Sequence, residues 1–283
     1  MKNKFFFFGH HKCATRYIIN ILNIVNKYLE LNHIEFHNDE LFNSNLENSI
    51  IQKNLDFVYY TNAKYKHITK IENNNIFNYK GFHLIRDPRD ILISAYFSHK
   101  NSHPVNEWTE LKKIKKKLNS VSLIEGIKYE MSLLKENLID LEEWNYTNPE
   151  IYELKFENLI EKPVEIITDI FVFLDLVDFH CVDTSIKALS KELINSISHK
   201  LIKKKPIKTK KIPLTKLLNA IIVNDFKVLS HGRNNGTEDN LSHYRKGISG
   251  DWKNYFNNDI KEKFKKDFPN LLIKLGYEEN NEW

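Results

Sequence analysis

Cysteine is scarce in this chain of 283 residues, which contains only Cys13 and Cys181. Two cysteines are too few for the disulfide framework of a small secreted protein, so we expect a reducing compartment, the cytoplasm. Long apolar runs are missing as well. Residues 5–8 form an apolar run far shorter than a signal-peptide core, and no later segment is long enough to span a bilayer.

The charge is modest and unevenly distributed. The formal net charge is +5, and 41% of the residues are hydrophobic, enough for one sizeable core, so we expect a single domain over residues 1–283. Lysine runs of this kind are typical of solvated faces or loops, and they also fit a surface that attracts an anionic acceptor or nucleic acid. The two clusters are Lys112, Lys113, Lys115, Lys116 and Lys117, and Lys200, Lys203, Lys204, Lys205, Lys208, Lys210 and Lys211.

Strand and helix patterns alternate along the chain. Continuous apolar or aromatic runs predict strands at residues 5–8, 56–60, 82–85 and 151–156. Apolar residues at helical spacing predict helices after Thr15 (Ile18, Leu22, Val25, Leu29), over 124–141, from Pro163 (Val164, Ile167, Phe171, Leu174), over 184–195 and over 214–229. Asp87 and Pro88 are typical of a helix start, and that helix should reach about His99. This order predicts an α/β fold, a mostly parallel sheet with helices on both faces.

Three stretches are expected to contain loops: 31–50, the polar and lysine-rich 100–118, and 198–243. In the last of these the helical pattern is lost among lysine and proline at 198–213, and residues 231–243 are rich in glycine, asparagine and aspartate; the predicted helix 214–229 lies between them. We interpret 198–243 as a mobile segment on the acceptor side of the domain.

The first candidate site follows the first strand, at Gly9-His10-His11-Lys12-Cys13-Ala14-Thr15-Arg16-Tyr17. A strand, a polar loop and a helix in this order place an anion-binding helix N-terminus at the edge of a sheet. The loop lacks the G-x-x-x-x-G-K-[ST] spacing of a nucleoside-triphosphate P-loop, which argues against a kinase or ATPase.

Two further motifs lie downstream. The segment 83–96 contains Arg86 at a strand end and Ser94 in the helix that follows, while Arg89 and Asp90 are expected to form a solvated pair or a structural bridge. Residues 245–256 read Arg-Lys-Gly-Ile-Ser-Gly-Asp-Trp-Lys-Asn-Tyr-Phe, which combines a basic pair for phosphate with glycines that let the backbone approach a ligand.

This last motif resembles the R-K-G-x-x-G-D-W-K-N-x-F signature of cytosolic-type sulfotransferases at all nine fixed positions. The loop at 9–17 resembles the family's K-x-G-T-T loop, with Ala14 in place of Gly and Arg16 in place of the second Thr. The resemblance implies a P-loop-like sheet of about five strands and the co-substrate 3'-phosphoadenosine 5'-phosphosulfate (PAPS), with 3',5'-adenosine bisphosphate (PAP) as product and no metal.

The same resemblance implies roles for individual residues. Lys12 corresponds to the lysine at the 5'-phosphate and bridging oxygen, where it would stabilise the leaving group. Arg86, Ser94, Arg245, Lys246 and Gly247 correspond to the 3'-phosphate site. Tyr17 and Phe156 correspond to residues beside the adenine, and Phe156 stands where the family has a tyrosine. The expected cofactor-binding set is Lys12, Cys13, Ala14, Thr15, Arg16, Tyr17, Arg86, Ser94, Phe156, Arg245, Lys246 and Gly247.

The general base is expected to be His67. Tyr65-Lys66-His67-Ile68 resembles the family's K-T-H-L-P segment, although its Thr and Pro are absent here. An imidazole of near-neutral pKa can accept a proton at pH 7. His10, His11, His99 and His103 are rivals, because all lie close in sequence to the candidate loops.

The sequence therefore predicts an enzyme, a PAPS-dependent sulfotransferase that acts on a hydroxyl or amine. Ala14, Arg16 and Phe156 keep open an alternative, a sulfotransferase-like module that binds PAPS or PAP with little transfer. A nucleic-acid-binding protein is a third interpretation, but no helix-turn-helix or RNA-binding motif supports it, so no nucleic-acid partner is expected. The acceptor could be a small molecule, a carbohydrate or a peptide, and the lysine clusters favour an anionic one. Nothing in the sequence indicates an oligomeric state.

Overall fold

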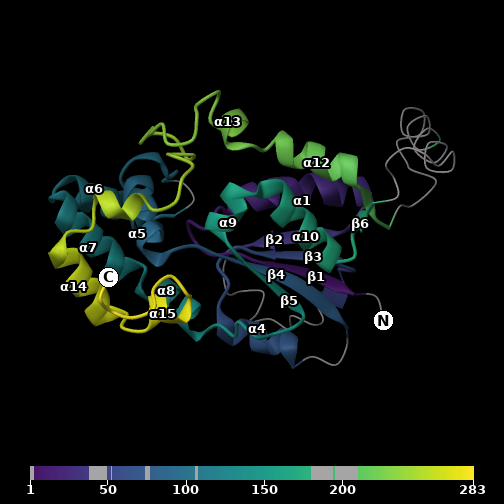
Figure 1. The fold of residues 1–283 in the computed structure, drawn as a ribbon, viewed down its shortest axis with the longest axis horizontal. Helices are drawn as coiled ribbons and strands as arrows, with labels where there is room; N and C mark the ends of the chain where they lie inside the picture. The colour runs from purple at the N-terminus through teal and green to yellow at the C-terminus, as the bar shows by residue number, and fades with distance from the viewer. Residues whose placement is uncertain are drawn as a thin grey trace.

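The computed structural model describes residues 3–37, 50–51, 53–73, 77–105, 108–179, 194 and 210–283. Strands and helices alternate around a central sheet (Figure 1). The strands are β1 (Lys4–Phe8), β2 (His33–Phe36), β3 (Phe57–Tyr60), β4 (Tyr79–Ile85), β5 (Ile151–Lys155), β6 (Val177–Asp178) and β7 (Ile212–Pro213). The helices are α1 (Thr15–Leu29), α4 (Tyr65–Glu72), α5 (Pro88–Phe97), α6 (Leu111–Asn119), α7 (Leu123–Leu133), α8 (Lys135–Glu143), α9 (Phe156–Glu161), α10 (Pro163–Phe173), α12 (Leu214–Ile222), α13 (Phe226–Leu229), α14 (Asn258–Asp267) and α15 (Leu271–Lys274), with a π-helical turn η1 (Ser98–Ser102) and a 3-10 turn η2 (Asp251–Asn254).

The central sheet of the described residues has five parallel strands in the order β2-β3-β1-β4-β5. β1 lies in the middle, where Phe7 pairs in register with Tyr59 of β3 and Phe82 of β4. The side chains of Phe5 and Phe7 pack in one hydrophobic cluster and those of Phe6 and Phe8 in another. A strand buried on both faces needs apolar residues throughout, which explains the unbroken phenylalanine run. The predicted α/β class and parallel sheet are confirmed.

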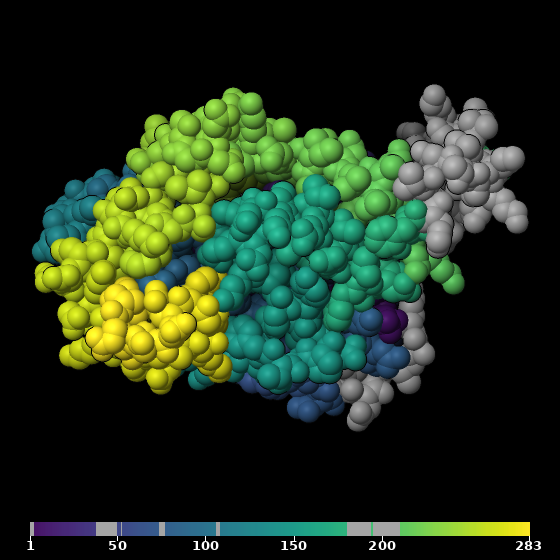
Figure 2. Space-filling model, in the orientation of Figure 1, coloured from purple at the N-terminus to yellow at the C-terminus, as the bar shows by residue number. Residues whose placement is uncertain are grey.

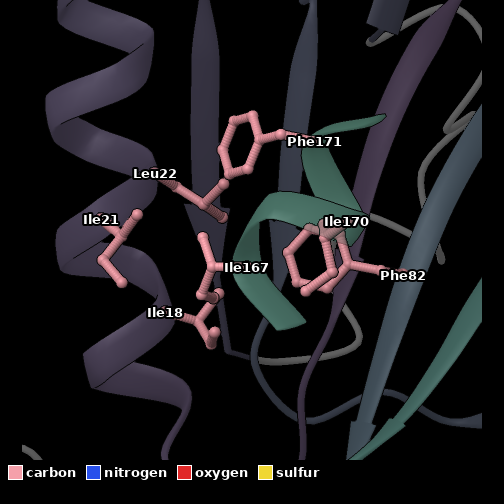
Figure 3. A pocket seen from close by; sticks show the side chains of 7 residues that line it. All are labelled: Ile18, Ile21, Leu22, Phe82, Ile167, Ile170 and Phe171. Carbon is pink, nitrogen blue, oxygen red and sulfur yellow. The ribbon is translucent and has the colours of Figure 1, made fainter. Parts of the chain in front are cut away.

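Helices cover both faces of the sheet. α1, α10 and α12 lie over one face, and α4 lies below the other (Figure 1). Figure 3 shows how the first face is filled: Ile18 and Leu22 of α1 point toward Ile167 and Ile170 of α10, and Phe82 of β4 lies on the side of this group away from α1. The regular spacing of apolar residues in α1 and α10 therefore places both helices against the strand that leads into Arg86.

Two sequence expectations are wrong in their details. Residues 100–118 are not a loop throughout: η1 continues α5 to Ser102, and α6 begins at Leu111, with Leu111, Ile114 and Leu118 buried on one face. The lysines of α6 largely lie on its exposed side, as expected of a solvated helix face. The predicted helix 124–141 is two helices, α7 and α8, which meet at Leu134, where ψ is 8°.

The other differences are smaller. Val164 of α10 is exposed, and Ile170 takes its place in the core. Phe156 is not the last residue of a strand but the first residue of α9. The edge strand β2 has no counterpart among the predicted strands, because its four residues, His-Ile-Glu-Phe, contain no continuous apolar run.

The later part of the chain lies beside the sheet's helical layer. Of the predicted mobile segment, residues 198–209 lie outside the described residues, as does the predicted helix 184–195 apart from residue 194. Residues 214–229 form α12 and α13 rather than one helix. Figure 2 shows this green stretch along one side of the molecule and the yellow C-terminal segment below it, with a strip of blue chain between them. Among the described residues, no helix has the length and apolar character needed to cross a membrane.

Candidate functional site

The candidate site lies where the parallel strands end. Because β1, β4 and β5 run in the same direction, the segments that follow Phe8, Ile85 and Lys155 all leave the sheet at one edge. These segments contain Lys12, Arg86 and Phe156, so the topology brings three of the predicted residues to the same place.

The loop after β1 is a tight turn into α1. Lys12 and Ala14 have φ of 63° and 55°, in the left-handed region that favours glycine, and Ala14 is the N-cap of α1 without a side-chain hydrogen bond. The carbonyl of His10 accepts hydrogen bonds from the Cys13 amide at 3.2 Å and the Thr15 hydroxyl at 2.9 Å. This turn directs the unpaired first amides of a fifteen-residue helix toward the strand ends, where they can bind an anion.

Lys12 is surrounded by positive charge. Burial and the nearby guanidinium groups of Arg86 and Arg245 lower the pKa of Lys12 to about 8. Buried cations repel one another unless an anion lies between them, so this trio has the charge expected of a phosphate-binding site. Cys13 beside it is buried, and burial raises the pKa of its thiol to about 12, which keeps it uncharged.

Arg86 connects the first loop to the last motif. Its guanidinium donates to the carbonyl of Lys12 at 3.1 Å and to the carbonyl of Ile248 at 3.4 Å. It also stacks over the ring of Phe156, 4.3 Å from the ring centroid. Its Nε is buried and has no partner among the described residues, which leaves a donor for a ligand.

Two acidic residues, Asp251 and Asp90, hold the loop that contains Gly247 and Gly250, which we call the glycine-containing loop. Buried Asp251 binds Arg245 at 2.5 Å and Lys246 at 2.6 Å. Burial raises the pKa of Asp251, but the hydrogen bonds from Lys246 and Arg245 outweigh this effect and keep the pKa below its ordinary value. Asp90 of α5 accepts from the amides of Gly250 at 2.6 Å and Trp252 at 2.9 Å. The loop is thus attached directly to the helix that follows Arg86.

Arg89 and Asp90 are therefore structural rather than solvated. Both are buried, and Arg89 pairs with Asp87 at 2.8 Å and Glu278 at 2.5 Å. The Arg89 guanidinium lies 3.8 Å from the ring centroid of Trp252 and also stacks on Trp283. Of the two interpretations given for this pair, the structural bridge is confirmed and the solvated pair is wrong.

A shallow pocket joins these parts. Its lining includes Lys12, Ser94, Ser98, Ser242, His243 and Arg245. Ser94 and Arg245 were predicted from separate motifs more than 150 residues apart, and the fold brings them to one pocket with Lys12. His243 is an addition that no motif indicated.

Other predicted residues lie at the margin of this pocket or away from it. The side chain of Arg16 is exposed and pairs with Glu35 of β2 at 3.0 Å. Tyr17 packs partly buried on the core, and burial, with the charge of Asp225, raises its pKa to about 12. Gly247 has φ of 66° and lies against the ring of Phe226.

His67 lies in helix α4 rather than in a loop. It is buried, and its Nδ1 is 2.8 Å from the hydroxyl of Tyr60 on β3. The turn before α4 contacts the loop after β1 through the Ala63 amide, which donates to the carbonyl of Gly9 at 2.9 Å. The role of His67 as general base stays a prediction.

Histidines around the loop after β1 form two hydrogen-bonded series. In one, His11 contacts His99, which contacts Glu130; in the other, His10 contacts His83, which contacts Glu153. Glu130, His83 and Glu153 were not anticipated, because their partners are distant in sequence. No cluster of His, Cys, Asp and Glu within the described ranges has the geometry of a metal site.

A parallel sheet with a basic pocket at its strand ends, beside a helix N-terminus, defines a class: α/β domains that bind a phosphorylated ligand. The chain belongs to one family of this class, the sulfotransferase domain family, whose model matches residues 4–276. The predicted family is thereby confirmed.

A solved structure shows the same fold, and two others are similar to the chain over most of its length. The mouse sulfotransferase SULT7A1 complexed with PAP is 13% identical, covers 96% of this chain and 85% of its own, and has a TM-score of 0.56. Retinol dehydratase in complex with androsterone and PAP is 13% identical over 95% of this chain and 80% of its own, with a TM-score of 0.49. A sulfotransferase domain from the curacin biosynthetic pathway is 12% identical over 98% and 99%, with a TM-score of 0.44. No curated protein matches the sequence.

Proposed function

We propose that this protein transfers the sulfuryl group of PAPS to a hydroxyl or amine acceptor. The observation that carries the proposal is the meeting of Lys12, Arg86 and Arg245 at the strand ends, with the R-K-G-x-x-G-D-W-K-N-x-F loop attached to the same place. The sulfotransferase family and the PAP in the similar mouse structure support PAPS as the co-substrate. The family match along residues 4–276 also supports a single domain. The cytoplasmic location stays a prediction.

The residues present fit a doubly phosphorylated nucleotide. Arg86, Ser94, Arg245, Lys246 and Gly247 would hold the 3'-phosphate, since Arg and Lys supply charge and glycine allows close approach. The ring of Phe156 and that of Tyr17 would pack against the adenine. Thr15, Arg16 and the residues 13–14 would contribute backbone amides at the N-terminus of α1.

Catalysis in this scheme depends on position and charge. The acceptor oxygen or nitrogen forms a bond to sulfur, the bond between sulfur and the bridging oxygen breaks, and PAP leaves with that electron pair. Lys12 stabilises the negative charge that develops on the bridging oxygen, and the N-terminus of α1 adds its dipole. The proton of the acceptor passes to a general base, for which His67 is the residue predicted from the sequence.

A second function has a specific observation in its favour. Ala14 occupies a left-handed position where the family's loop has glycine, and Arg16 turns away to Glu35. A loop altered in this way fits a module that binds PAP or PAPS without efficient transfer. Measured sulfate transfer distinguishes the enzyme from the module.

The test begins with isothermal titration of PAP into the wild type, Arg245→Ala and Lys253→Ala. Lys253 is an exposed cation in the same loop, so its variant controls for the loss of one positive charge. We expect binding that weakens about 10- to 100-fold in Arg245→Ala and little in Lys253→Ala, because a charge-assisted contact contributes about 1.5–3 kcal/mol. A wild type that binds no PAP would refute the proposed co-substrate.

The acceptor is then sought with ³⁵S-labelled PAPS. The panel contains one member of each class that remains open: 2-naphthol, a sterol alcohol, a tyrosyl peptide and an unsulfated anionic polysaccharide. Label in any of them establishes an enzyme. Tight PAP binding with no label in any acceptor would support the binding module.

A further inference from the structure

A series of three side chains, two buried and one half-buried, ends beside Lys12. His99, in the π-helical turn η1, has its Nδ1 2.9 Å and 3.0 Å from the two carboxylate oxygens of Glu130 in α7. Its Nε2 lies 3.1 Å from Nε2 of His11, the residue that precedes Lys12. His99 and Glu130 are 1% and 0% exposed. We call Glu130, His99 and His11 the histidine relay.

The hydrogen bonds of the relay determine which ring nitrogens carry protons. A carboxylate only accepts, so Nδ1 of His99 must donate to Glu130. When His99 and His11 are both neutral, Nε2 of His99 accepts from Nε2–H of His11. This arrangement leaves Nδ1 of His11 unprotonated, and no described residue hydrogen-bonds to it.

The surroundings of His11 keep its ring unprotonated at neutral pH. Burial lowers its pKa well below the ordinary value, and Lys12 and the neighbouring rings of His99, His103 and His243 act in the same direction. Glu130 faces His99 from α7 and is the acidic group of the relay. Below the pKa of His11 the ring is protonated and cannot accept a proton; above it, and so at pH 7, Nδ1 is free to do so.

The two alternatives are less well placed. The second series, Glu153–His83–His10, has the same bonding pattern, but His10 is 2% exposed and packs against Trp144. His67 has its Nδ1 beside the Tyr60 hydroxyl. Of these three histidines, His10, His11 and His67, only His11 is the sequence neighbour of a residue that lines the pocket, Lys12.

We propose that His11 accepts the proton of the sulfuryl acceptor at Nδ1, and that Glu130 and His99 position its ring for this step. The inference rests on the proposed function. As the acceptor oxygen bonds to sulfur and PAP leaves, the acceptor proton moves to Nδ1 of His11. The resulting positive charge on His11 is shared through the hydrogen bond to His99 and balanced by Glu130. His11 is the catalytic residue, and the other two are positioning residues.

The first experiment needs no acceptor. In ¹⁵N-histidine-labelled wild type, ¹⁵N chemical shifts and long-range proton couplings should show Nδ1 of His11 unprotonated and Nδ1 of His99 protonated at pH 7. A protonated Nδ1 on His11 would overturn the inference, whatever the protein transfers.

The second experiment measures PAP affinity and ³⁵S transfer to the four-member acceptor panel. His11→Ala and the more conservative His11→Gln should bind PAP within about threefold of wild type, while transfer falls about 10²-fold or more. If both variants transfer sulfate within threefold of the wild-type rate, the inference about His11 is overturned and the proposed function is not. The same holds if His67→Ala loses transfer and His11→Gln does not. A wild type with neither PAP binding nor transfer overturns the proposed function, and the inference with it.

The positioning role has its own measurement. Glu130→Gln removes the relay's negative charge, so a protonated His11 becomes less stable, and the acid limb of the kcat–pH profile should move to lower pH. We expect kcat to fall about tenfold with an unchanged KM for PAPS. Glu153→Gln is the matched control in the second series and should leave the limb in place. An acid limb that moves equally in both variants would show that Glu130 has no specific role.

Discussion

Replacing Gly247 with alanine should destabilise the glycine-containing loop for two separable reasons. Gly247 has φ of +66°, a left-handed conformation that costs a residue with a side chain about 1–2 kcal/mol. A Cβ at this position would also lie 2.6–2.8 Å from three ring carbons of Phe226 on α13. The ring would have to move, because the Cβ position is fixed by the backbone.

Gly250→Ala separates the two effects. Its φ is +76°, and a Cβ there would meet no described atom within 4 Å, so only the backbone cost applies. Alanine also restricts the unfolded chain, which offsets about 0.4–1 kcal/mol of that cost. We therefore expect the free energy of unfolding to fall by about 1 kcal/mol in Gly250→Ala. An overpacked contact adds about 1–3 kcal/mol, so the loss in Gly247→Ala should be about 2–4 kcal/mol.

Urea denaturation of both variants gives the comparison, and PAP titration shows whether the displaced loop also weakens binding. The clash with the ring is tested in a Phe226→Ala background. There, adding Gly247→Ala should lower the free energy of unfolding only as much as Gly250→Ala does in the wild type, because the ring is absent. Equal losses in Gly247→Ala and Gly250→Ala, or an undiminished loss from Gly247→Ala in the Phe226→Ala background, would refute the assigned contact.

Two further predictions concern the loop after β1. Ala14→Gly should raise the free energy of unfolding by about 0.5–1 kcal/mol, because relief of the left-handed conformation at φ 55° exceeds the entropy of the added glycine. The same change at Ala95, inside α5, should lower it by about 1 kcal/mol or more in urea denaturation. The pKa of Lys12 is about 8 in the folded protein and higher in the unfolded chain, so between those values the unfolded chain binds more protons. The free energy of unfolding of the free protein should accordingly rise with pH from about 8 toward 10. In Lys12→Met most of this rise should be absent. When PAP binds, its negative charge should raise the pKa of Lys12, so at pH 8.5 the amine takes up a proton from the buffer. The heat of PAP binding should therefore differ between phosphate and Tris buffers in the wild type, and not in Lys12→Met.

Much of the fold could be predicted because the core helices and strands have strong local patterns. The phenylalanine run of β1 and the spacing of Ile18, Leu22, Val25 and Leu29 in α1 depend only on which face is buried. The failures have local explanations. The lysines of α6 outnumber the three apolar residues that face the core, and the break at Leu134 uses residues that are ordinary helix formers. Packing, not propensity, sets those boundaries.

The site residues also fall into a part that the sequence could predict and a part that it could not. Arg245, Lys246 and Gly247 belong to one continuous motif, so sequence reasoning could find them together. The contact of His99 with Glu130 joins positions 31 residues apart, and that of His99 with His11 joins positions 88 apart. No local spacing marks such pairs, and only the fold reveals which histidine has an oriented ring.

The two hydrogen bonds from Asp90 to the loop amides have a consequence for engineering. The amides of Gly250 and Trp252 donate to a carboxylate on a helix some 160 positions earlier in the chain. The signature loop is therefore not a portable module: transplanted to another scaffold without an equivalent of Asp90, it would lose the carboxylate that holds its turn. Loop and helix would have to be exchanged as one piece, and hydrogen exchange at those two amides would report whether the graft had kept its shape.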